Sequence, residues 1–164
     1  MANRELTGIL LVGGASSRFG SPKALVLFEG ETLGERAWRL LGEACDERIV
    51  VGGDGLGDPG TGPVAAIAVG LRAAKGEVAI VVPVDMPLLT ASALKQLADA
   101  CRDAAVAQVG PLPCAVARRT LPAFETGERR LRTVLDGLDT ARVQLDDRLL
   151  ANVNTPADLD RLAR

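Results

Sequence analysis

Residues 78–84 read VAIVVPV and are followed directly by Asp85, Met86 and Pro87. A continuous apolar run of this length is typical of a β-strand that is buried on both faces of a parallel sheet. Pro83 has no N–H to donate, so we expect the chain to leave the ladder near that residue. The segment therefore predicts a central strand that ends beside an acidic side chain.

The segments on either side of this strand alternate between strand and helix patterns. Strands are predicted at 8–12, 48–51, 106–109, 114–117 and 142–145. Helices are predicted at 31–45, 63–74, 90–102 and 155–162, with two short helices within 121–138. This alternation predicts an α/β fold with a mostly parallel sheet and helices on both faces. In such sheets ligands bind beyond the carboxyl ends of the strands.

Composition excludes several classes of function. The 164 residues favour one domain, 1–164, and hydrophobic residues make up 48% but aromatic residues only 2%, so the core must be aliphatic. A formal charge of −2 gives no indication of nucleic-acid binding. The chain has no histidine, which excludes histidine triads, histidine metal sites and imidazole acid–base catalysis.

Three cysteines, Cys45, Cys101 and Cys114, have no metal-type spacing and read as small buried hydrophobic residues of a reducing compartment. The apolar run at 6–12 is too short for a signal peptide or a membrane span. No other run reaches spanning length without a charge or a proline. We therefore expect a soluble protein of the cytoplasm with no membrane partner.

The loop at 13–23, GGASSRFGSPK, follows the first predicted strand. Gly13 and Gly14 let the backbone approach a ligand closely and expose its N–H groups to an anion. Arg18 and Lys23 add positive charge. The spacing matches neither the Walker loop nor the dinucleotide fingerprint. An ordinary turn with surface charges is the alternative, but the combination of glycines with both cations favours a triphosphate site.

Asp85 is a candidate Mg²⁺ ligand because it follows a buried strand. Mg²⁺ is usually bound by one or two carboxylates together with phosphate oxygens and water. The alternative is that Asp85 only caps the turn before Pro87. Position alone leaves these two interpretations nearly even, and the 13–23 loop favours the metal.

Asn152 and Asn154 lie two residues apart on a predicted extended segment, so their side chains should point the same way. Each amide offers both donors and an acceptor to a ligand. The alternative is a helix-entry turn, which Asn154, Thr155 and Pro156 could form without a ligand.

Together these segments resemble the molybdenum cofactor guanylyltransferase family. The shared segments, in the family's order and rough spacing, are the loop at 11–23, GPVAA at 62–66, VDMPLL at 84–89, ERRLR at 128–132 and NVNTP at 152–156. The resemblance covers nearly the whole chain. Many nucleotidyltransferases share the first loop, whereas NVNTP is the more specific element.

The resemblance implies a doubly wound, Rossmann-like nucleotidyltransferase fold and Mg²⁺-dependent transfer of GMP from GTP to molybdopterin, with release of pyrophosphate. Proteins of cofactor biosynthesis or molybdoenzyme maturation are implied as possible partners. The implied site residues are Leu11, Gly13 and Gly14 at guanine and ribose, Lys23 at phosphate, Asp85 at Mg²⁺, and Asn152 and Asn154 at molybdopterin.

Some positions depart from the family pattern. Pro22 stands where the family usually has an acid before the lysine, Val12 replaces an alanine, and Cys114 follows Pro113 where a histidine is common. The family's acid ahead of Gly62 corresponds to Asp58, taken here as nucleotide-binding, or to Asp54. These departures concern the acceptor more than the phosphate chemistry.

The implied reaction needs no general base, because a phosphate nucleophile is already ionised near neutral pH. Catalysis would come from positioning and charge, supplied by Lys23, Arg18, the loop amides and the metal at Asp85. Three alternatives remain: a cytidylyltransferase acting on molybdopterin, a sugar-phosphate nucleotidyltransferase, and a GTP-binding module without catalysis.

Overall fold

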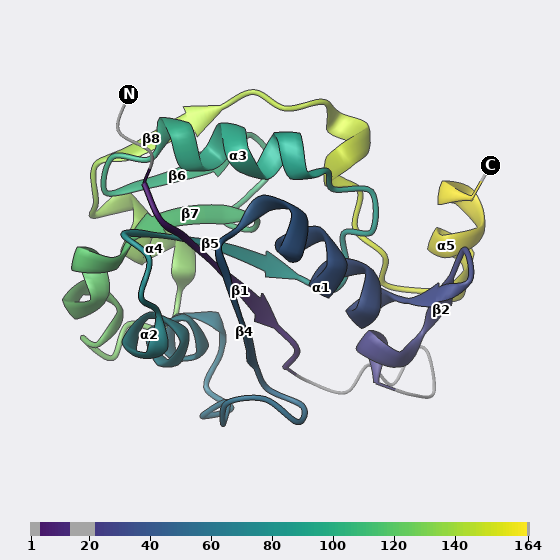
Figure 1. The fold of residues 1–164 in the computed structure, drawn as a ribbon, viewed down its shortest axis with the longest axis horizontal. Helices are drawn as coiled ribbons and strands as arrows, with labels where there is room; N and C mark the ends of the chain where they lie inside the picture. The colour runs from purple at the N-terminus through teal and green to yellow at the C-terminus, as the bar shows by residue number, and fades with distance from the viewer. Residues whose placement is uncertain (1–3, 14–21, 164) are drawn as a thin grey trace.

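The structure is a computed structural model that describes residues 4–13 and 22–163. A six-stranded sheet forms its centre, in the order β4-β1-β5-β7-β6-β8 (Figure 1). The strands are β1 (Leu6–Leu11), β4 (Glu47–Val51), β5 (Val78–Pro83), β6 (Ala104–Ala107), β7 (Cys114–Ala117) and β8 (Thr140–Val143). Among them β7 is antiparallel to its two neighbours, and the other strands run parallel to one another. The predicted mostly parallel sheet is therefore confirmed.

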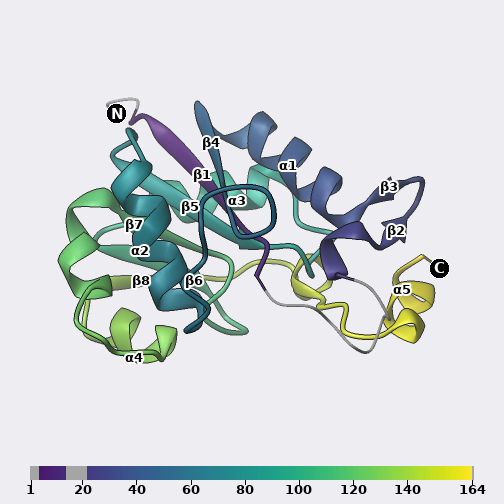
Figure 2. The same ribbon diagram turned by 90° about the horizontal axis from the view of Figure 1, so that it is seen from below.

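Helices cover both faces of this sheet (Figures 1 and 2). Alternate residues of a strand enter different cores, since Leu10 and Ile80 face one cluster while Ile9 and Val81 face the other. The first cluster packs under α1 (Leu33–Ala44) and α3 (Ala91–Ala100), and the second under α2 (Pro63–Ala73) and α4 (Leu131–Asp136). As predicted from the composition, both clusters are mainly aliphatic.

Helix boundaries follow the capping side chains. Thr90 caps α3 by accepting a hydrogen bond from Ala93 N at 3.2 Å. The predicted start of the first helix at Glu31 is wrong by two residues. Thr32 and Glu35 form a capping box, which makes Thr32 the N-cap, so α1 begins at Leu33. Glu31 and Thr32 belong to the short strand β3 (Glu31–Thr32), paired with β2 (Leu27–Phe28).

Strands β6 and β8 each begin two residues before their predicted positions. Beyond β6, the Gln108 amide binds the backbone of Leu145 with both its oxygen and its nitrogen, at 3.0 and 2.6 Å, in place of ladder bonds. Val109, predicted as part of the strand, is exposed. The region 121–138, predicted to hold two short helices, contains the end of a 3₁₀ helix, η3 (Arg118–Phe124), and α4, which begins at Leu131.

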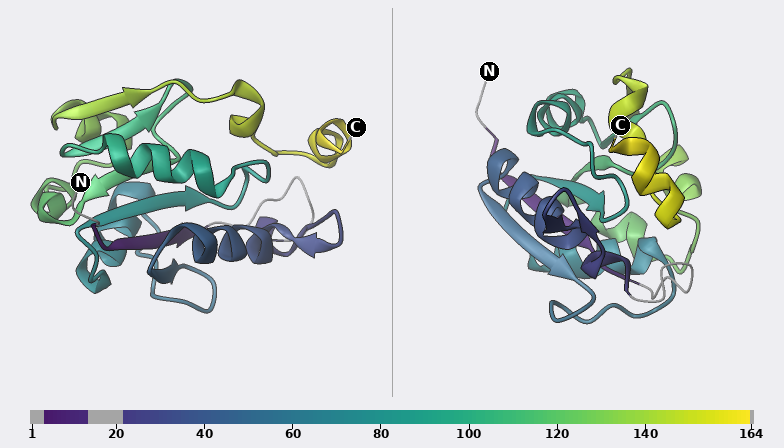
Figure 3. Two further views of the ribbon diagram at one scale, coloured as in Figure 1. Left: turned by 45° about the horizontal axis from the view of Figure 1, so that its top comes forward. Right: turned by 90° about the vertical axis from the view of Figure 1, so that its right-hand side faces the viewer.

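The chain ends in α5 (Pro156–Leu162), which lies beyond the sheet at the same end of the molecule as the β2–β3 hairpin (Figure 3). Two further 3₁₀ turns, η2 (Lys23–Leu25) and η4 (Asp147–Leu150), were not predicted. None of the helices in the described part of the chain is long and apolar enough to cross a membrane.

Candidate active site

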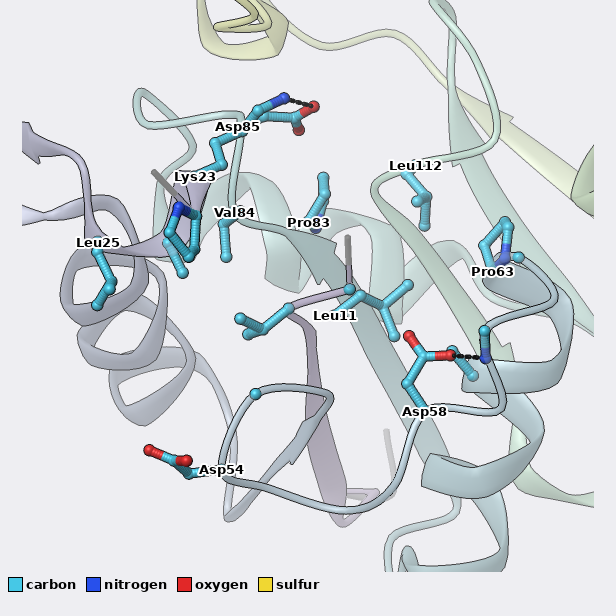
Figure 4. A pocket seen from close by; sticks show the side chains of 18 of the residues that line it. Leu11, Lys23, Leu25, Asp54, Asp58, Pro63, Pro83, Val84, Asp85 and Leu112 are labelled. Atoms are coloured by element: carbon cyan, nitrogen blue, oxygen red, sulfur yellow. Dashed lines mark hydrogen bonds and ion pairs between the residues drawn. The ribbon is translucent and has the colours of Figure 1, made fainter. Parts of the chain in front are cut away.

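A cavity of about 950 Å³ lies at the carboxyl edge of the sheet (Figure 4). It opens where β1 and β5 end, and the loop after β4 and the start of α2 form further walls. Leu112 reaches the same cavity from the segment before β7, because an antiparallel strand begins at the edge where parallel strands end. Six of the candidate site residues from the sequence line this cavity: Leu11, Gly13, Lys23, Asp58, Asp85 and Asn154.

Lys23, Asp85 and Asn154 meet at one end of the cavity, although they come from three distant segments. The Lys23 Nζ atom lies 3.7 Å from Asp85 Oδ2 and donates a hydrogen bond of 3.3 Å to Asn154 Oδ1. The Lys23 and Asp85 side chains are 19% and 26% exposed. An ammonium group with three donors can hold both partners and still offer a hydrogen bond to a phosphate.

The backbone also joins these segments. Val153 is fully buried, and its N–H donates to the carbonyl oxygen of Asp85 at 2.8 Å. Asn152 and Asn154 flank it and are both exposed, which agrees with their predicted shared side of an extended segment. Asn154 lines the cavity, whereas Asn152 is not among its described lining residues.

Burial raises the pKa of the Asp85 carboxyl above its usual value, and the Lys23 ammonium opposes this shift. The protein environment therefore disfavours a carboxylate here in spite of the ion pair. A bound cation would relieve this cost, because it adds positive charge beside the carboxylate. Asp85 is therefore a candidate ligand for a cation in the cavity.

Asp58 lies at the other end of the cavity, beside the end of β1 (Figure 4). Its Oδ1 accepts a hydrogen bond from Gly60 N at 2.8 Å, and a Cβ on Gly13 would lie 2.5 Å from its Oδ2. Gly13 thus leaves the space that the Asp58 carboxylate fills. Asp54, on the same loop, is exposed and also lines the cavity. Of the two acids, Asp58 is the one in contact with the first loop.

Two predicted site residues, Gly14 and Arg18, lie outside the described residues. The structure adds cavity-lining residues that the motifs did not indicate, among them Leu25 and Leu112. Leu25 is 65% exposed, so its side chain offers apolar surface beside the cavity. Neither Leu25 nor Leu112 belongs to a polar motif, so no chemical pattern in the sequence indicates either residue.

Cysteine chemistry is not part of this site. Burial raises the pKa of the Cys114 thiol to about 12 and that of Cys101 to about 11, so neither forms a thiolate near neutral pH. No group of three histidine, cysteine or acidic side chains within residues 4–13 and 22–163 could hold a metal ion. A metal here would need oxygen ligands from a substrate in addition to Asp85.

Comparison with known proteins identifies the family. The sequence profile of the MobA-like NTP transferase domain matches residues 8–144. The chain belongs to the MobA-like NTP transferase family. This assignment makes the chain a nucleotidyltransferase, and its cavity lies at the sheet edge where α/β folds bind their ligands.

Two MobA-like relatives align with this chain over nearly their full length. The chain is 36% identical to the "Probable molybdenum cofactor guanylyltransferase" of Deinococcus radiodurans, covering 96% of this chain and 94% of that one. It is 35% identical to the "Molybdenum cofactor guanylyltransferase" of Xanthomonas euvesicatoria, covering 97% and 95%. The structure of molybdopterin-guanine dinucleotide biosynthesis protein A from Archaeoglobus fulgidus aligns with a TM-score of 0.77 at 22% identity, covering 96% of each chain.

The MobA-like profile ends before the Asn152–Asn154 segment, whereas the two relatives align through nearly the whole chain. The alignment with these relatives therefore includes the segment that completes the Lys23 cluster.

Gly52, which follows β4 in the MobA-like fold, gives a test of the backbone beside the site. Its φ is +96°, and a Cβ there would lie 2.7 Å from the carbonyl oxygen of Val12. We expect Gly52→Ala to lower the free energy of unfolding by about 1–3 kcal/mol through strain. Gly57→Ala is the matched control, since its Cβ would meet open space, and should change stability by less than about 0.5 kcal/mol. Equal denaturation midpoints for the two variants would contradict this account.

Proposed function

We propose that this chain transfers GMP from GTP to molybdopterin and releases pyrophosphate. The observation that carries the proposal is the meeting of Lys23, Asp85 and Asn154 at one end of a large cavity. The names of the full-length relatives support guanine as the base and the molybdenum cofactor as the acceptor. We take residues 1–164 to act as one nucleotidyltransferase domain in the cytoplasm.

GTP would lie along the cavity with its base at the Asp58 end. Leu11 and Gly13 would line the guanine and ribose, and Gly14 is assigned the same role from the family resemblance. The Asp58 carboxylate is an acceptor that suits the amino and ring N–H donors of guanine. Cytosine offers an amino donor but no ring N–H, so this end of the cavity favours GTP over CTP.

The triphosphate would then reach Lys23 and Asp85 at the other end. An oxygen of the acceptor phosphate attacks the α-phosphorus, the bond to the β-phosphate bridging oxygen breaks, and pyrophosphate leaves with that electron pair. Lys23 binds phosphate oxygens and offsets negative charge that develops on them. Arg18 is proposed to assist from the glycine loop. No residue has to remove a proton, because the attacking phosphate is already ionised.

Mg²⁺ is the proposed metal, held by Asp85. A single carboxylate suits Mg²⁺, which fills its remaining positions with phosphate oxygens and water. When bound, the ion neutralises phosphate charge. Asp85 offers a partly exposed carboxylate at the cavity wall, so the residues present fit this ion.

The proposal is tested by incubating the purified protein with GTP and molybdopterin, with and without Mg²⁺, and measuring pyrophosphate release. We expect release only when GTP, acceptor and metal are all present. Release with CTP and molybdopterin would indicate the cytidylyltransferase, and release with a sugar phosphate would indicate the sugar nucleotidyltransferase. GTP binding without release for any acceptor would indicate a non-catalytic module. Proteins of cofactor biosynthesis or molybdoenzyme maturation are the proposed partners.

The two asparagines give a further prediction, because Asn154 accepts a hydrogen bond from Lys23 and no such bond to Asn152 is found among the described residues. We expect Asn152→Ala to raise the acceptor KM while GTP affinity stays nearly unchanged. Asn154→Ala should raise the acceptor KM and also lower kcat, since it removes a hydrogen bond that orients the Lys23 ammonium. Steady-state kinetics and calorimetric GTP titration separate the two effects. Weakened GTP binding in both variants would show that the pair serves the nucleotide instead.

A further inference from the structure

Asp158 is tied to the site although it is not among the described residues that line the cavity. It lies in the first turn of α5, and its Oδ2 accepts hydrogen bonds from the backbone N–H of Asn154 at 2.8 Å and of Thr155 at 3.0 Å. Arg161 donates to its other carboxylate oxygen. Because the side chain is only 15% exposed and both oxygens are engaged, the carboxylate is held in one position.

Through these bonds Asp158 contacts a residue, Asn154, that itself contacts Lys23. The Asn154 backbone that it binds carries the amide whose oxygen accepts from Lys23 Nζ. The preceding residue, Val153, donates its N–H to the Asp85 carbonyl. The turn fixed by Asp158 therefore contacts both residues at this end of the cavity, the side chain of Lys23 and the backbone of Asp85.

We propose that Asp158 is a positioning residue, which holds Asn154 where it orients the Lys23 ammonium. The proposal rests on the proposed function, in which Lys23 binds the phosphates of the nucleotide. A lysine side chain has many rotamers and loses their entropy when it is fixed. Through Asn154, Asp158 fixes the Lys23 ammonium before the substrate arrives, so less ordering is needed during the reaction.

The competing explanation is that Asp158 serves only to start α5. It forms a capping box with Thr155, whose hydroxyl accepts from Asp158 N at 3.3 Å. Thr155→Ala removes that half of the capping box but leaves both hydrogen bonds to the Asp158 carboxylate in place. The two roles predict different results for Thr155→Ala, which makes it the matched control.

The kinetic test compares kcat for Asp158→Ala, Thr155→Ala, Asn154→Ala and the Asn154→Ala/Asp158→Ala double variant. We expect Asp158→Ala to lower kcat about tenfold, as for a modest misplacement of a catalytic group. Thr155→Ala should stay within about twofold of the wild type, and Asp158→Asn, which keeps an acceptor oxygen, should retain more activity than Asp158→Ala. Because Asp158 acts through Asn154, the double variant should match Asn154→Ala and not show the product of both losses.

A second measurement needs no substrate. The chain has three lysines, Lys23, Lys75 and Lys95, so protein labelled with ¹³C at lysine Cε gives three signals in a heteronuclear NMR spectrum. The Lys23→Arg variant identifies the Lys23 signal by its loss. We expect this signal to shift in Asp158→Ala and Asn154→Ala, and to stay in place in Thr155→Ala and in Asp160→Asn, which removes an exposed charge of α5.

An unchanged Lys23 signal in Asp158→Ala would overturn the proposal, as would equal kinetic losses in Asp158→Ala and Thr155→Ala. A different result would show that the proposed function is wrong. In that case the wild-type protein releases no pyrophosphate from GTP and molybdopterin, and the Lys23 signal still reports whether Asp158 positions the lysine.

Discussion

Asp85→Asn is expected to reduce turnover on the order of 10³-fold, the largest effect of any conservative change in this site. Asparagine keeps the size of the side chain but removes the charge that attracts Mg²⁺. Activity should recover only partly at high Mg²⁺ concentration, because a neutral amide oxygen is a poor ligand. The measurement is pyrophosphate release across a range of Mg²⁺ concentrations.

The same variant makes a prediction about stability and its pH dependence. Burial raises the pKa of Asp85 in the folded protein, so the charged carboxylate destabilises the fold above that pKa. Asp85→Asn should therefore be at least as stable as the wild type at neutral pH. The difference should shrink as the pH falls through the Asp85 pKa, because the wild-type carboxyl then becomes neutral as well.

Asp99→Asn, which removes an exposed acid of α3, is the control for the loss of one charge and should change neither activity nor stability appreciably. If Asp85 only capped a turn, asparagine would replace it well and turnover would stay near normal. That outcome would reject the metal assignment and direct attention to Asp58.

Lys23→Ala is expected to lower turnover by about 10²–10³-fold, the usual effect of removing one group that stabilises transition-state charge. The side chain lies between Asp85 and Asn154, and no other described lysine is near the cavity. Lys23→Arg should also be impaired, because a planar fork cannot reproduce a compact ammonium held between two partners. Initial rates at saturating GTP and acceptor measure both effects.

Lys95→Ala controls for the loss of a positive charge, since Lys95 is an exposed residue of α3. Circular dichroism should show the same helix content and a similar melting midpoint for Lys23→Ala and the wild type. Near-normal turnover in Lys23→Ala would remove the central residue of the proposed mechanism.

Periodicity was sufficient to predict the strands with long buried runs. The VAIVVPV segment is central in the sheet, and β7 has the predicted bounds. Periodicity could not reveal that β7 runs antiparallel, since strand direction depends on how the loop at 108–113 folds back. It also misplaced β6, because Gln108 binds the backbone of Leu145 across a sequence separation of 37 residues.

In the candidate site, too, local patterns predicted some features, whereas contacts between distant segments decided the others. Lys23 was predicted as a site residue from its glycine-rich loop, and Asp85 from its position after a buried strand. In the structure the Lys23 Nζ atom lies 3.7 Å from Asp85 Oδ2. The bond between Lys23 and Asn154 joins residues that are 131 positions apart, and no local pattern contains it. For the same reason the sequence showed Asp158 only as an acid in the first turn of a helix, whereas its bond to the Asn154 backbone depends on the extended segment before it.

The reversed strand β7 places one wall of the cavity on a loop between two strands that are neighbours in the sheet. Four of the cavity-lining segments described above are continuous with a parallel strand or with α2, so a change in their length would disturb the packing of that element. Leu112 instead belongs to the connection between the antiparallel strands β6 and β7. Such a connection tolerates insertions at little thermodynamic cost. Lengthening it would reshape this wall of the cavity without a shift in the register of any strand.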